Sequence, residues 1–273
     1  MDDATTLVRR QIERELSASL RRPLVIGVSG AQGCGKSTMA RSLVNQLTTE
    51  GVSAAHLSLD DFYLGRAERR KLAARLHPLF VTRGPPGTHD VAAARALLGK
   101  IKFGAAAPAP QFDKGRDEPL DLKREIPARL QVFIFEGWCL GAKAQNERDL
   151  AAPINMLETV YDAQGVWRGA VNDALGGAYQ RLFAEVDHLV YLRAPNFDIV
   201  SRWRNEQERA LADASPPDQR PLLMSADEIS FFVQHFERVT RSMMTDLPGR
   251  AGLTLQLDER RRVIGVTTPK TAR

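Results

Sequence analysis

Short apolar runs alternate with longer stretches of helical periodicity along the chain. The apolar runs are residues 24–29, 53–59, 130–135, 188–192 and 253–257. Continuous runs of this length are typical of strands that are buried on both faces. Helical patterns lie between them, such as residues 36–50, which Gly51 closes as a C-cap. Strands that alternate with helices predict an α/β fold, a three-layer α/β/α sandwich with a mainly parallel central sheet.

Three segments depart from this alternation. Apolar residues at four-residue spacing predict a helix within residues 1–22, ahead of the first strand. Residues 82–90 and 104–121 are dense in Pro, Gly and charge, which predicts surface loops. The length of 273 residues alone suggests about two domains. We expect a single domain over residues 1–273 instead, with inserted loops in residues 82–121.

Composition excludes some classes of protein but does not identify a binding partner. Hydrophobic residues make up 43% and charged residues 26% of the chain, which excludes a disordered or fibrous protein. The two cysteines, Cys34 and Cys139, provide neither a disulfide framework nor metal-ligand spacing, which favours a reducing compartment. The first 20 residues contain no apolar stretch of membrane-spanning length, so we expect a cytoplasmic protein with no membrane partner. A net charge of +5 suits an enzyme for anionic substrates as well as a nucleic-acid binder.

The most informative motif follows the first predicted strand. Residues 30–37 read Gly30-Ala31-Gln32-Gly33-Cys34-Gly35-Lys36-Ser37 and fit the P-loop pattern; Thr38 follows. Such glycines let backbone N–H groups surround phosphates at the start of a helix. Lys36 would reach the β- and γ-phosphates, and the Ser37 hydroxyl would bind Mg²⁺. A chance match in a Gly-rich turn is the alternative, but the position between a buried strand and a helix favours the P-loop.

Acidic residues follow two other predicted strands. Asp60 and Asp61 come after the second strand, where ligands bind in parallel sheets. Asp60 could accept a proton from a substrate hydroxyl or hold Mg²⁺ through water, and a turn or N-cap role is the alternative. Glu136 ends the third strand after four apolar residues, in a Walker B arrangement that could contact Mg²⁺. A capping role is the alternative for Glu136.

Together these motifs resemble those of the small-metabolite kinases that include uridine kinase, phosphoribulokinase and bacterial pantothenate kinase. The resemblance rests on the P-loop, on Asp60-Asp61-Phe62-Tyr63 and on Phe135-Glu136-Gly137-Trp138. Two further segments, from Arg83 to Asp90 and from Pro110 to Lys114, are similar to the D-glycerate 3-kinase branch and to related fungal ATP-binding kinase-like proteins. The likeness covers residues 24 to 257.

The resemblance implies a P-loop kinase with a helical lid and with ATP and Mg²⁺ as cofactors. It implies Lys36 and Asp60 as catalytic residues, with Asp60 as the base. Implied metal contacts are Ser37, Asp60 and Glu136. Implied substrate-binding residues are Asp61, Tyr63, Arg83, His89, Asp90, Asp113 and Lys114, and the lid region, residues 193–212, would contribute Arg193, Arg202 and Arg204.

The sequence therefore predicts phosphoryl transfer from Mg·ATP to an alcohol on a small metabolite. We expect D-glycerate as the acceptor, because its carboxylate would suit Arg83 or Lys114. A nucleoside or a pantothenate-type alcohol remains an alternative. A further alternative is an ATP-binding switch with slow hydrolysis, against which Asp60 argues. We expect no nucleic-acid partner, and the sequence leaves the oligomeric state open.

Overall fold

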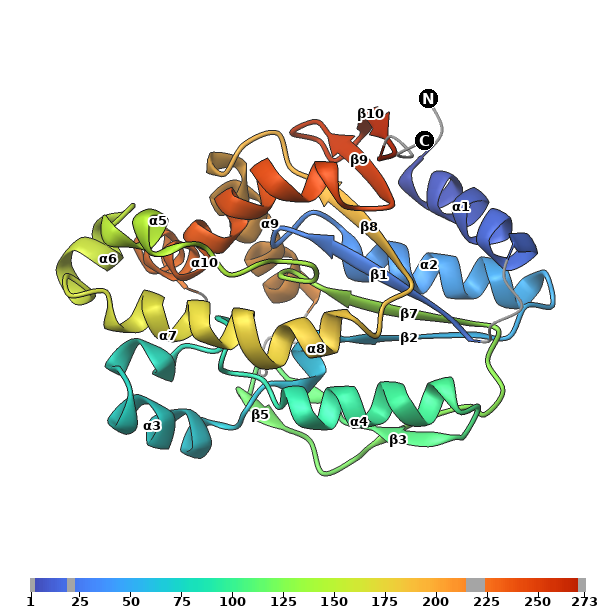
Figure 1. Cartoon of the computed structure of the whole chain (residues 1–273), viewed down its shortest axis with the longest axis horizontal. Coiled ribbons are helices and arrows are strands. Elements are labelled where there is room, and N and C mark those ends of the chain that lie inside the picture. The colour runs from blue at the N-terminus through green and yellow to red at the C-terminus, as the bar shows by residue number, and fades with distance from the viewer. Residues whose placement is uncertain (1–2, 19–22, 215–223, 270–273) are drawn as a thin grey trace.

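A six-stranded sheet forms the centre of the protein (Figure 1). The computed structural model describes residues 3–18, 23–214 and 224–269, with the backbone alone for residues 208–214. In spatial order the strands are β10 (Val263–Thr267), β9 (Leu253–Leu257), β8 (His188–Arg193), β1 (Leu24–Gly30), β7 (Val132–Gly137) and β2 (Ala54–Ser58). β10 is antiparallel to β9, and the other pairs are parallel. The five predicted strands are confirmed, and β10 adds a sixth at the edge.

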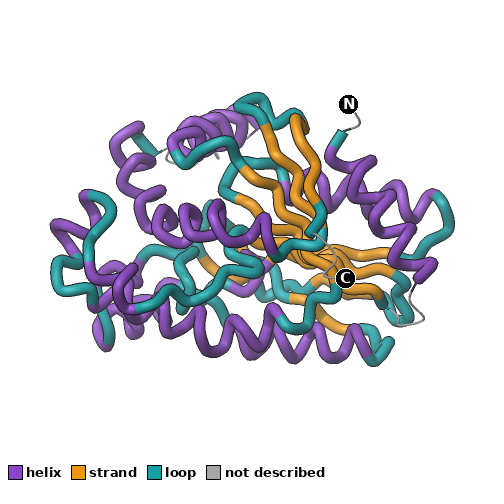
Figure 2. Tube along the Cα trace, turned by 45° about the horizontal axis from the view of Figure 1, so that its top comes forward, coloured by secondary structure: helices purple, strands orange, loops and turns teal. Residues whose placement is uncertain are grey.

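Helices cover both faces of this sheet, as predicted. One face packs against α1 (Ala4–Ala18), α2 (Lys36–Thr49) and α9 (Asp198–Ala214), and the other against α4 (Val91–Lys102), α7 (Val166–Ala174) and α8 (Gln180–Phe183). The helix α10 (Ala226–Asp246) contributes to both cores. Side chains alternate between the faces along β1, so that Ile26 packs toward α2 and Val25 toward the opposite core. Figure 2 shows the strands enclosed between the two helical layers.

Shorter elements complete the described chain. They are α3 (Arg66–Arg75), α5 (Glu147–Ala151), α6 (Met156–Tyr161), the 3₁₀ turns η1 (Leu59–Phe62), η2 (Pro78–Val81) and η5 (Leu247–Gly249), and the π-helical turn η3 (Leu175–Tyr179). In the parts of the chain that the structure describes, every helix is too short or too polar to cross a membrane. The predicted helix within residues 1–22 is α1, and residues 1–2 and 19–22 lie outside the described residues.

Of the two predicted surface loops, residues 82–90 are more buried than expected, whereas residues 104–121 lie at the surface. Gly84, Pro85, Pro86, Thr88 and His89 are buried. Helix α4 follows, and then two small β-ribbons. In these ribbons β3 (Ala107–Ala109) pairs with β6 (Arg124–Ile126), and β4 (Phe112–Asp113) pairs with β5 (Glu118–Pro119). The prediction of a surface loop was wrong for residues 82–90, where Pro and Gly serve buried turns. Residues 104–121 lie at the surface as predicted, most of them exposed or half-buried, but they contain short strands.

The strand order brings the sequence motifs to one edge of the sheet. β7 lies between β1 and β2, so that Glu136 is in register with Val28 on one side and with Ser58 on the other. The carboxyl ends of β1, β7 and β2 therefore place the P-loop, Glu136 and Asp60 next to one another. Ligands bind at this edge in open α/β sheets.

Candidate active site

The P-loop forms between the end of β1 and the start of α2, where the sequence predicts it. Gly33 and Gly35 have φ of 76° and 97°, a left-handed conformation that a residue with a side chain adopts at a cost. A Cβ on Gly33 would lie 2.5 Å from the Cβ of Trp203 in α9, so this glycine also permits close packing. Lys36 is 9% exposed, and its ammonium donates to the carbonyl of Ala31 at 2.9 Å. The lysine therefore curls back over the loop that it would use to hold phosphates.

Ser37 and Glu136 form the part of the site that suits a divalent cation. The Ser37 hydroxyl donates to Oε1 of Glu136 at 2.6 Å, and Glu136 is only 4% exposed. Nearby, the side-chain amide of Gln32 is buried without a hydrogen-bond partner among the described residues. Mg²⁺ is held in proteins by one or two oxygen ligands together with water and phosphate oxygens. Ser37 and Glu136 fit that requirement, and the orphaned Gln32 amide indicates that a polar ligand belongs beside them.

Asp60 is the second residue of the η1 turn after β2, and both of its carboxylate oxygens have protein donors. The ammonium of Lys114 lies 2.5 Å from Oδ2, and the Tyr63 hydroxyl donates to Oδ1 at 2.8 Å. Burial raises the pKa of Asp60, but the charge of Lys114 and the hydrogen bonds from Lys114 and Tyr63 outweigh it and hold this pKa well below its usual range. Asp60 is therefore an ionised carboxylate at the edge of the sheet. The sequence also predicted Asp60 as a metal contact. Because its oxygens bond to Lys114 and Tyr63, Asp60 is not part of the Ser37–Glu136 pair that suits a cation.

Asp61 has a structural position rather than the substrate-binding one that the sequence predicts. Its Oδ2 accepts a hydrogen bond from the backbone N–H of Ser58 at 3.2 Å and closes a capping box around η1. Burial raises the pKa of Asp61. The cap turns this carboxylate back toward β2, so of the two neighbouring acids only Asp60 faces the cavity.

Three other predicted acceptor residues also lie outside the cavity. Asp90 is the N-cap of α4 and accepts from the N–H of Ala93 at 2.9 Å. Asp113 closes the turn between β4 and β5 by accepting from the N–H of Gly115 at 2.8 Å. His89 lies behind Tyr63, where its Nδ1 is 2.5 Å from the Tyr179 hydroxyl and burial lowers its pKa to about 4. The sequence interpretation missed these roles because cap and turn residues are of the same types as substrate ligands.

Arg83 and Lys114 do line the cavity, and they are held in different ways. The Arg83 guanidinium donates to Asp117 at 2.5 Å and stacks over the ring of Phe112 at 5.6 Å. Asp117 is also bonded to the buried Arg69, so Arg83 is tied to a fixed partner. Lys114 is 55% exposed on the β4–β5 turn, and its ammonium contacts Asp60.

The three predicted lid arginines separate in the structure. Arg204 of α9 lines the cavity and lies over the ring of Phe232 at 5.3 Å. Arg202 faces away, toward Glu259 at 3.0 Å in the β9–β10 turn. Arg193 ends β8 in register with Gln256 and is not among the residues that line the cavity. Residues two positions apart in a helix lie on different faces, so only one of these two arginines of α9 faces the cavity.

The structure adds residues that the sequence did not single out. Arg261, in the turn between β9 and β10, donates to the carbonyl of Gly33 at 2.6 Å. Trp138 donates through its ring N–H to the carbonyl of Gly84 at 3.0 Å and packs edge-on against Phe236 of α10. Neither contact has a local sequence signal, because each joins segments far apart in the chain.

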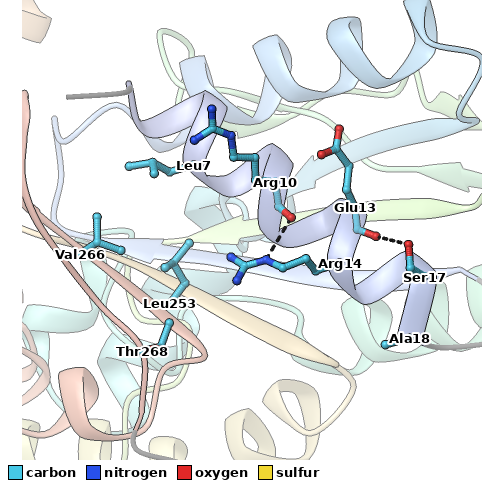
Figure 3. Close-up of a pocket in the computed structure, with 9 residues that line it drawn as sticks. All are labelled: Leu7, Arg10, Glu13, Arg14, Ser17, Ala18, Leu253, Val266 and Thr268. Atoms are coloured by element: carbon cyan, nitrogen blue, oxygen red, sulfur yellow. Dashed lines mark hydrogen bonds between the residues drawn. The ribbon is translucent and has the colours of Figure 1, made fainter.

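These residues enclose one small cavity beside a larger one. The smaller, of about 90 Å³, is lined by Gln32, Gly33, Lys36, Ser37, Asp60, Tyr63, Arg83, Lys114, Glu136, Trp138, Arg204, Gln207, Phe232 and Phe236. The larger, of about 610 Å³, lies on the other side of the P-loop between the ends of α1, α2 and α9 and contains Arg261. A groove of about 940 Å³ between α1 and the β9–β10 edge contains none of the predicted site residues (Figure 3). The chemistry-bearing side chains are therefore concentrated in the small cavity.

Comparisons with known proteins identify the family of this chain. Residues 25–140 match the model of the phosphoribulokinase/uridine kinase family. The chain is 34% identical over 227 residues to the uncharacterized kinase mug58 of Schizosaccharomyces pombe, covering 79% of either protein. It is 30% identical over 263 residues to the chloroplastic D-glycerate 3-kinase of Arabidopsis thaliana, covering 89% of this chain and 54% of that relative. This chain thus spans about half the length of the plant protein.

A solved structure shows the same fold. The D-glycerate 3-kinase from Cryptococcus neoformans var. grubii superposes with a TM-score of 0.83, covering 98% of this chain and 100% of that one, at 22% identity. At this identity the similarity concerns the fold. The family match, the relative of 34% identity and the P-loop geometry agree, and the chain is a phosphotransferase that belongs to the phosphoribulokinase/uridine kinase family.

Proposed function

We propose that this kinase transfers the γ-phosphoryl group of ATP, with Mg²⁺, to a hydroxyl group of a small anionic metabolite, and that the metabolite is D-glycerate. One observation carries the proposal. A single cavity of about 90 Å³ holds the phosphate-binding Lys36, the cation-binding pair of Ser37 and Glu136, and the carboxylate of Asp60 beside two cations, Arg83 and Lys114.

Each of these groups makes a specific contact in the proposed reaction. The P-loop N–H groups and Lys36 bind the β- and γ-phosphates, and Lys36 exchanges the Ala31 carbonyl for phosphate oxygens. Bound Mg²⁺ would be held by Ser37 and Glu136 and would neutralise charge on the phosphates. Asp60 orients the acceptor hydroxyl and receives its proton as the oxygen bonds to the γ-phosphorus and the bond from that phosphorus to the β-phosphate oxygen breaks.

The remaining side chains of the cavity would stabilise charge and exclude water. Arg204 provides a guanidinium on the lid side, where charge on the transferring phosphoryl group would be stabilised. Trp138, Phe232 and Phe236 form an apolar wall that limits the room for water around the reacting atoms. Arg83 suits a carboxylate, since a planar guanidinium can bind it through two hydrogen bonds.

Two observations outside the cavity support D-glycerate as the acceptor. The plant relative of 30% identity is a D-glycerate 3-kinase, and the solved structure that superposes over 98% of this chain carries the same name. Within the cavity, Arg83 and Lys114 suit the carboxylate of glycerate, whereas uridine has no carboxylate. We infer from these observations that glycerate is the acceptor.

An acceptor screen tests the proposal. ADP release is measured with Mg·ATP and D-glycerate, L-glycerate, uridine, cytidine, pantothenate or ribulose 5-phosphate, and phosphorylated product is identified by mass spectrometry. We expect D-glycerate to give the highest kcat/KM. Preferred phosphorylation of uridine or pantothenate would overturn the acceptor but not the kinase. ADP release that no acceptor accelerates would favour a nucleotide-dependent switch.

A further inference from the structure

The base and the cation that faces it form an ion pair that weakens the base. Lys114 Nζ lies 2.5 Å from Oδ2 of Asp60, while Tyr63 occupies Oδ1 at 2.8 Å. An acceptor hydroxyl needs one of these oxygens within hydrogen-bond distance before it can lose its proton. In the arrangement that the structure shows, each oxygen already accepts one hydrogen bond, and the ammonium of Lys114 neutralises the charge of the carboxylate. A carboxylate held in this way is a poor proton acceptor, and the loss of one donor would make Asp60 a stronger base.

Lys114 is the donor that can leave at the smaller cost. Tyr63 is 8% exposed, lies 4.7 Å from the ring of His89 and 5.2 Å from that of Phe112, and forms a β-bridge with His89, so its hydroxyl is fixed by packing. The Lys114 side chain is 55% exposed and sits on the short turn between β4 and β5. Among the described residues, Asp60 is the sole hydrogen-bond partner of its ammonium.

The second cation of the cavity is held differently. Arg83 is bonded to Asp117 at 2.5 Å and stacked on Phe112, and Asp117 is bonded in turn to the buried Arg69. Arg83 therefore presents a fixed charge, whereas the charge of Lys114 is shared with the base. An anion that enters between Arg83 and Lys114 would therefore compete with Asp60 for Lys114, while Arg83 stays bonded to Asp117.

We propose that Lys114 gates the base: it covers Asp60 while the acceptor site is empty and moves to the anionic group of the acceptor when one binds, which exposes Oδ2 to the acceptor hydroxyl. The inference rests on the proposed kinase function and deepens it. Water that enters without an anion finds Asp60 covered, so ATP is not hydrolysed wastefully. Lys114 is thus a positioning residue that makes the base available only to an anionic acceptor.

The gate also restricts the class of acceptor. The hydroxyl must bond to Oδ2 while the anionic group bonds to Lys114 Nζ, and each hydrogen bond spans about 2.7–3.0 Å. An acceptor must therefore carry an anionic group as well as the hydroxyl that it presents to Asp60. Short hydroxy acids meet this condition. Neutral nucleosides do not.

The test compares ATP hydrolysis with and without an acceptor. In Lys114→Met, which keeps most of the side chain but removes the charge, we expect phosphate release without acceptor to rise about tenfold, because Asp60 is no longer paired with a cation. A factor of ten corresponds to about 1.4 kcal/mol. The KM for D-glycerate should rise in the same variant. A merely structural role for Lys114 would lower both activities. Arg116→Met, a change to a 79% exposed cation two residues away, is the matched control and should leave both rates unchanged.

A second measurement uses the wild-type protein and does not depend on the folding of a variant. D-Lactate carries the carboxylate of glycerate but lacks the hydroxyl at the third carbon. It should draw Lys114 from Asp60 and stimulate ATP hydrolysis several-fold in the wild type, and it should have no such effect in Lys114→Met.

The outcomes separate the gate from the proposed function. If D-glycerate is phosphorylated but D-lactate does not stimulate hydrolysis and Lys114→Met does not raise it, the gate is wrong and the acceptor is right. If D-glycerate is not phosphorylated, the acceptor is wrong, while a rise in hydrolysis in Lys114→Met would still support the gate for another anionic acceptor.

Discussion

Arg261 and Gly33 join the last hairpin of the sheet to the P-loop. The Nε of Arg261 donates to the Gly33 carbonyl at 2.6 Å, its guanidinium lies 5.0 Å from the ring of Trp203, and the same guanidinium contacts Glu206 at 2.6 Å. Arg261 has a φ of 64°, a left-handed conformation that costs a residue with a side chain about 1–2 kcal/mol. The turn is thus held against the P-loop at a conformational cost, which the three contacts offset.

Arg261→Ala should therefore weaken ATP binding more than catalysis. The lost hydrogen bond is partly exposed, so we expect a loss of about 1 kcal/mol, or roughly a fivefold rise in the KM for ATP with kcat within a factor of about two. Steady-state kinetics with ATP as the varied substrate measure this. Arg260→Ala removes the preceding, exposed arginine and should behave like the wild type. An unchanged KM in Arg261→Ala would mean that the turn does not position the P-loop.

Lys36→Ala should nearly abolish turnover without unfolding the protein. Lys36 is the cation of the P-loop, where the proposed reaction places the phosphates, and removing one preorganised charge of this kind lowers kcat by about 10³. Circular dichroism should give an unchanged helical spectrum. The exposed Lys100, near the end of α4, supplies the control Lys100→Ala, which should keep full activity. Near-normal turnover in Lys36→Ala would contradict the phosphate-binding role of the loop.

Asp60→Asn and Asp61→Asn form a matched pair at adjacent positions. Asn at position 60 keeps the shape but cannot take up a proton, so kcat should fall by about 10²–10⁴ while ATP binding changes little. Asn at position 61 can still accept the Ser58 N–H, so both activity and stability should stay close to those of the wild type. A dead Asp61→Asn beside an active Asp60→Asn would show that the other acid is the base.

The sequence predicted the parts of the site that carry a local signal. The P-loop spacing, the strand before it and the helix after it are local, and Asp60 and Glu136 each follow a continuous apolar run. The order of β2, β7 and β1, which the sequence did not predict, brings these positions together. The fold followed for the same reason, because its strands are continuous apolar runs.

The acceptor side could not be predicted in the same way. Asp61, Asp90 and Asp113 have the residue types of substrate ligands, yet each accepts hydrogen bonds from backbone N–H groups two or three residues away. Whether a carboxylate caps a turn or faces a cavity depends on backbone angles that one sequence does not reveal. Arg261 was missed because its partner, Gly33, is 228 positions away.

Arg83→Lys should reduce the use of D-glycerate while leaving ATP binding unaffected. The Asp117 contact fixes the guanidinium at the cavity wall, and a lysine cannot reproduce its planar pair of donors. Loss of a charge-assisted hydrogen bond costs about 1.5–3 kcal/mol, which is about 10- to 150-fold in kcat/KM for glycerate. Arg75→Lys, at an exposed position at the end of α3, is the control. Wild-type kinetics in Arg83→Lys would assign the carboxylate to Lys114 alone.

Buried histidines should make the protein sensitive to acid. Burial lowers the pKa of His89 to about 4 from its ordinary 6.5, although the charge of Asp60 opposes the shift, and burial lowers the pKa values of His56 and His235 to about 4 as well. Between pH 4 and pH 6.5 these histidines bind protons in the unfolded chain but not in the folded protein. The stability is therefore fully present above about pH 6.5 and is lost as the pH falls toward 4.

His89→Asn tests the contribution of one of these groups. The amide can still bond to the Tyr179 hydroxyl, but it cannot be protonated in the unfolded state. We expect a lower Tm than that of the wild type at pH 7 and a smaller fall in Tm between pH 7 and pH 5, as measured by scanning calorimetry. Tyr179→Phe, which removes the partner hydroxyl and keeps the histidine, should lower Tm at pH 7 without reducing the fall. An equal fall in His89→Asn and in the wild type would show that His89 is not kept neutral by burial, because a group with the same pKa in the folded and unfolded chains adds nothing to the pH dependence.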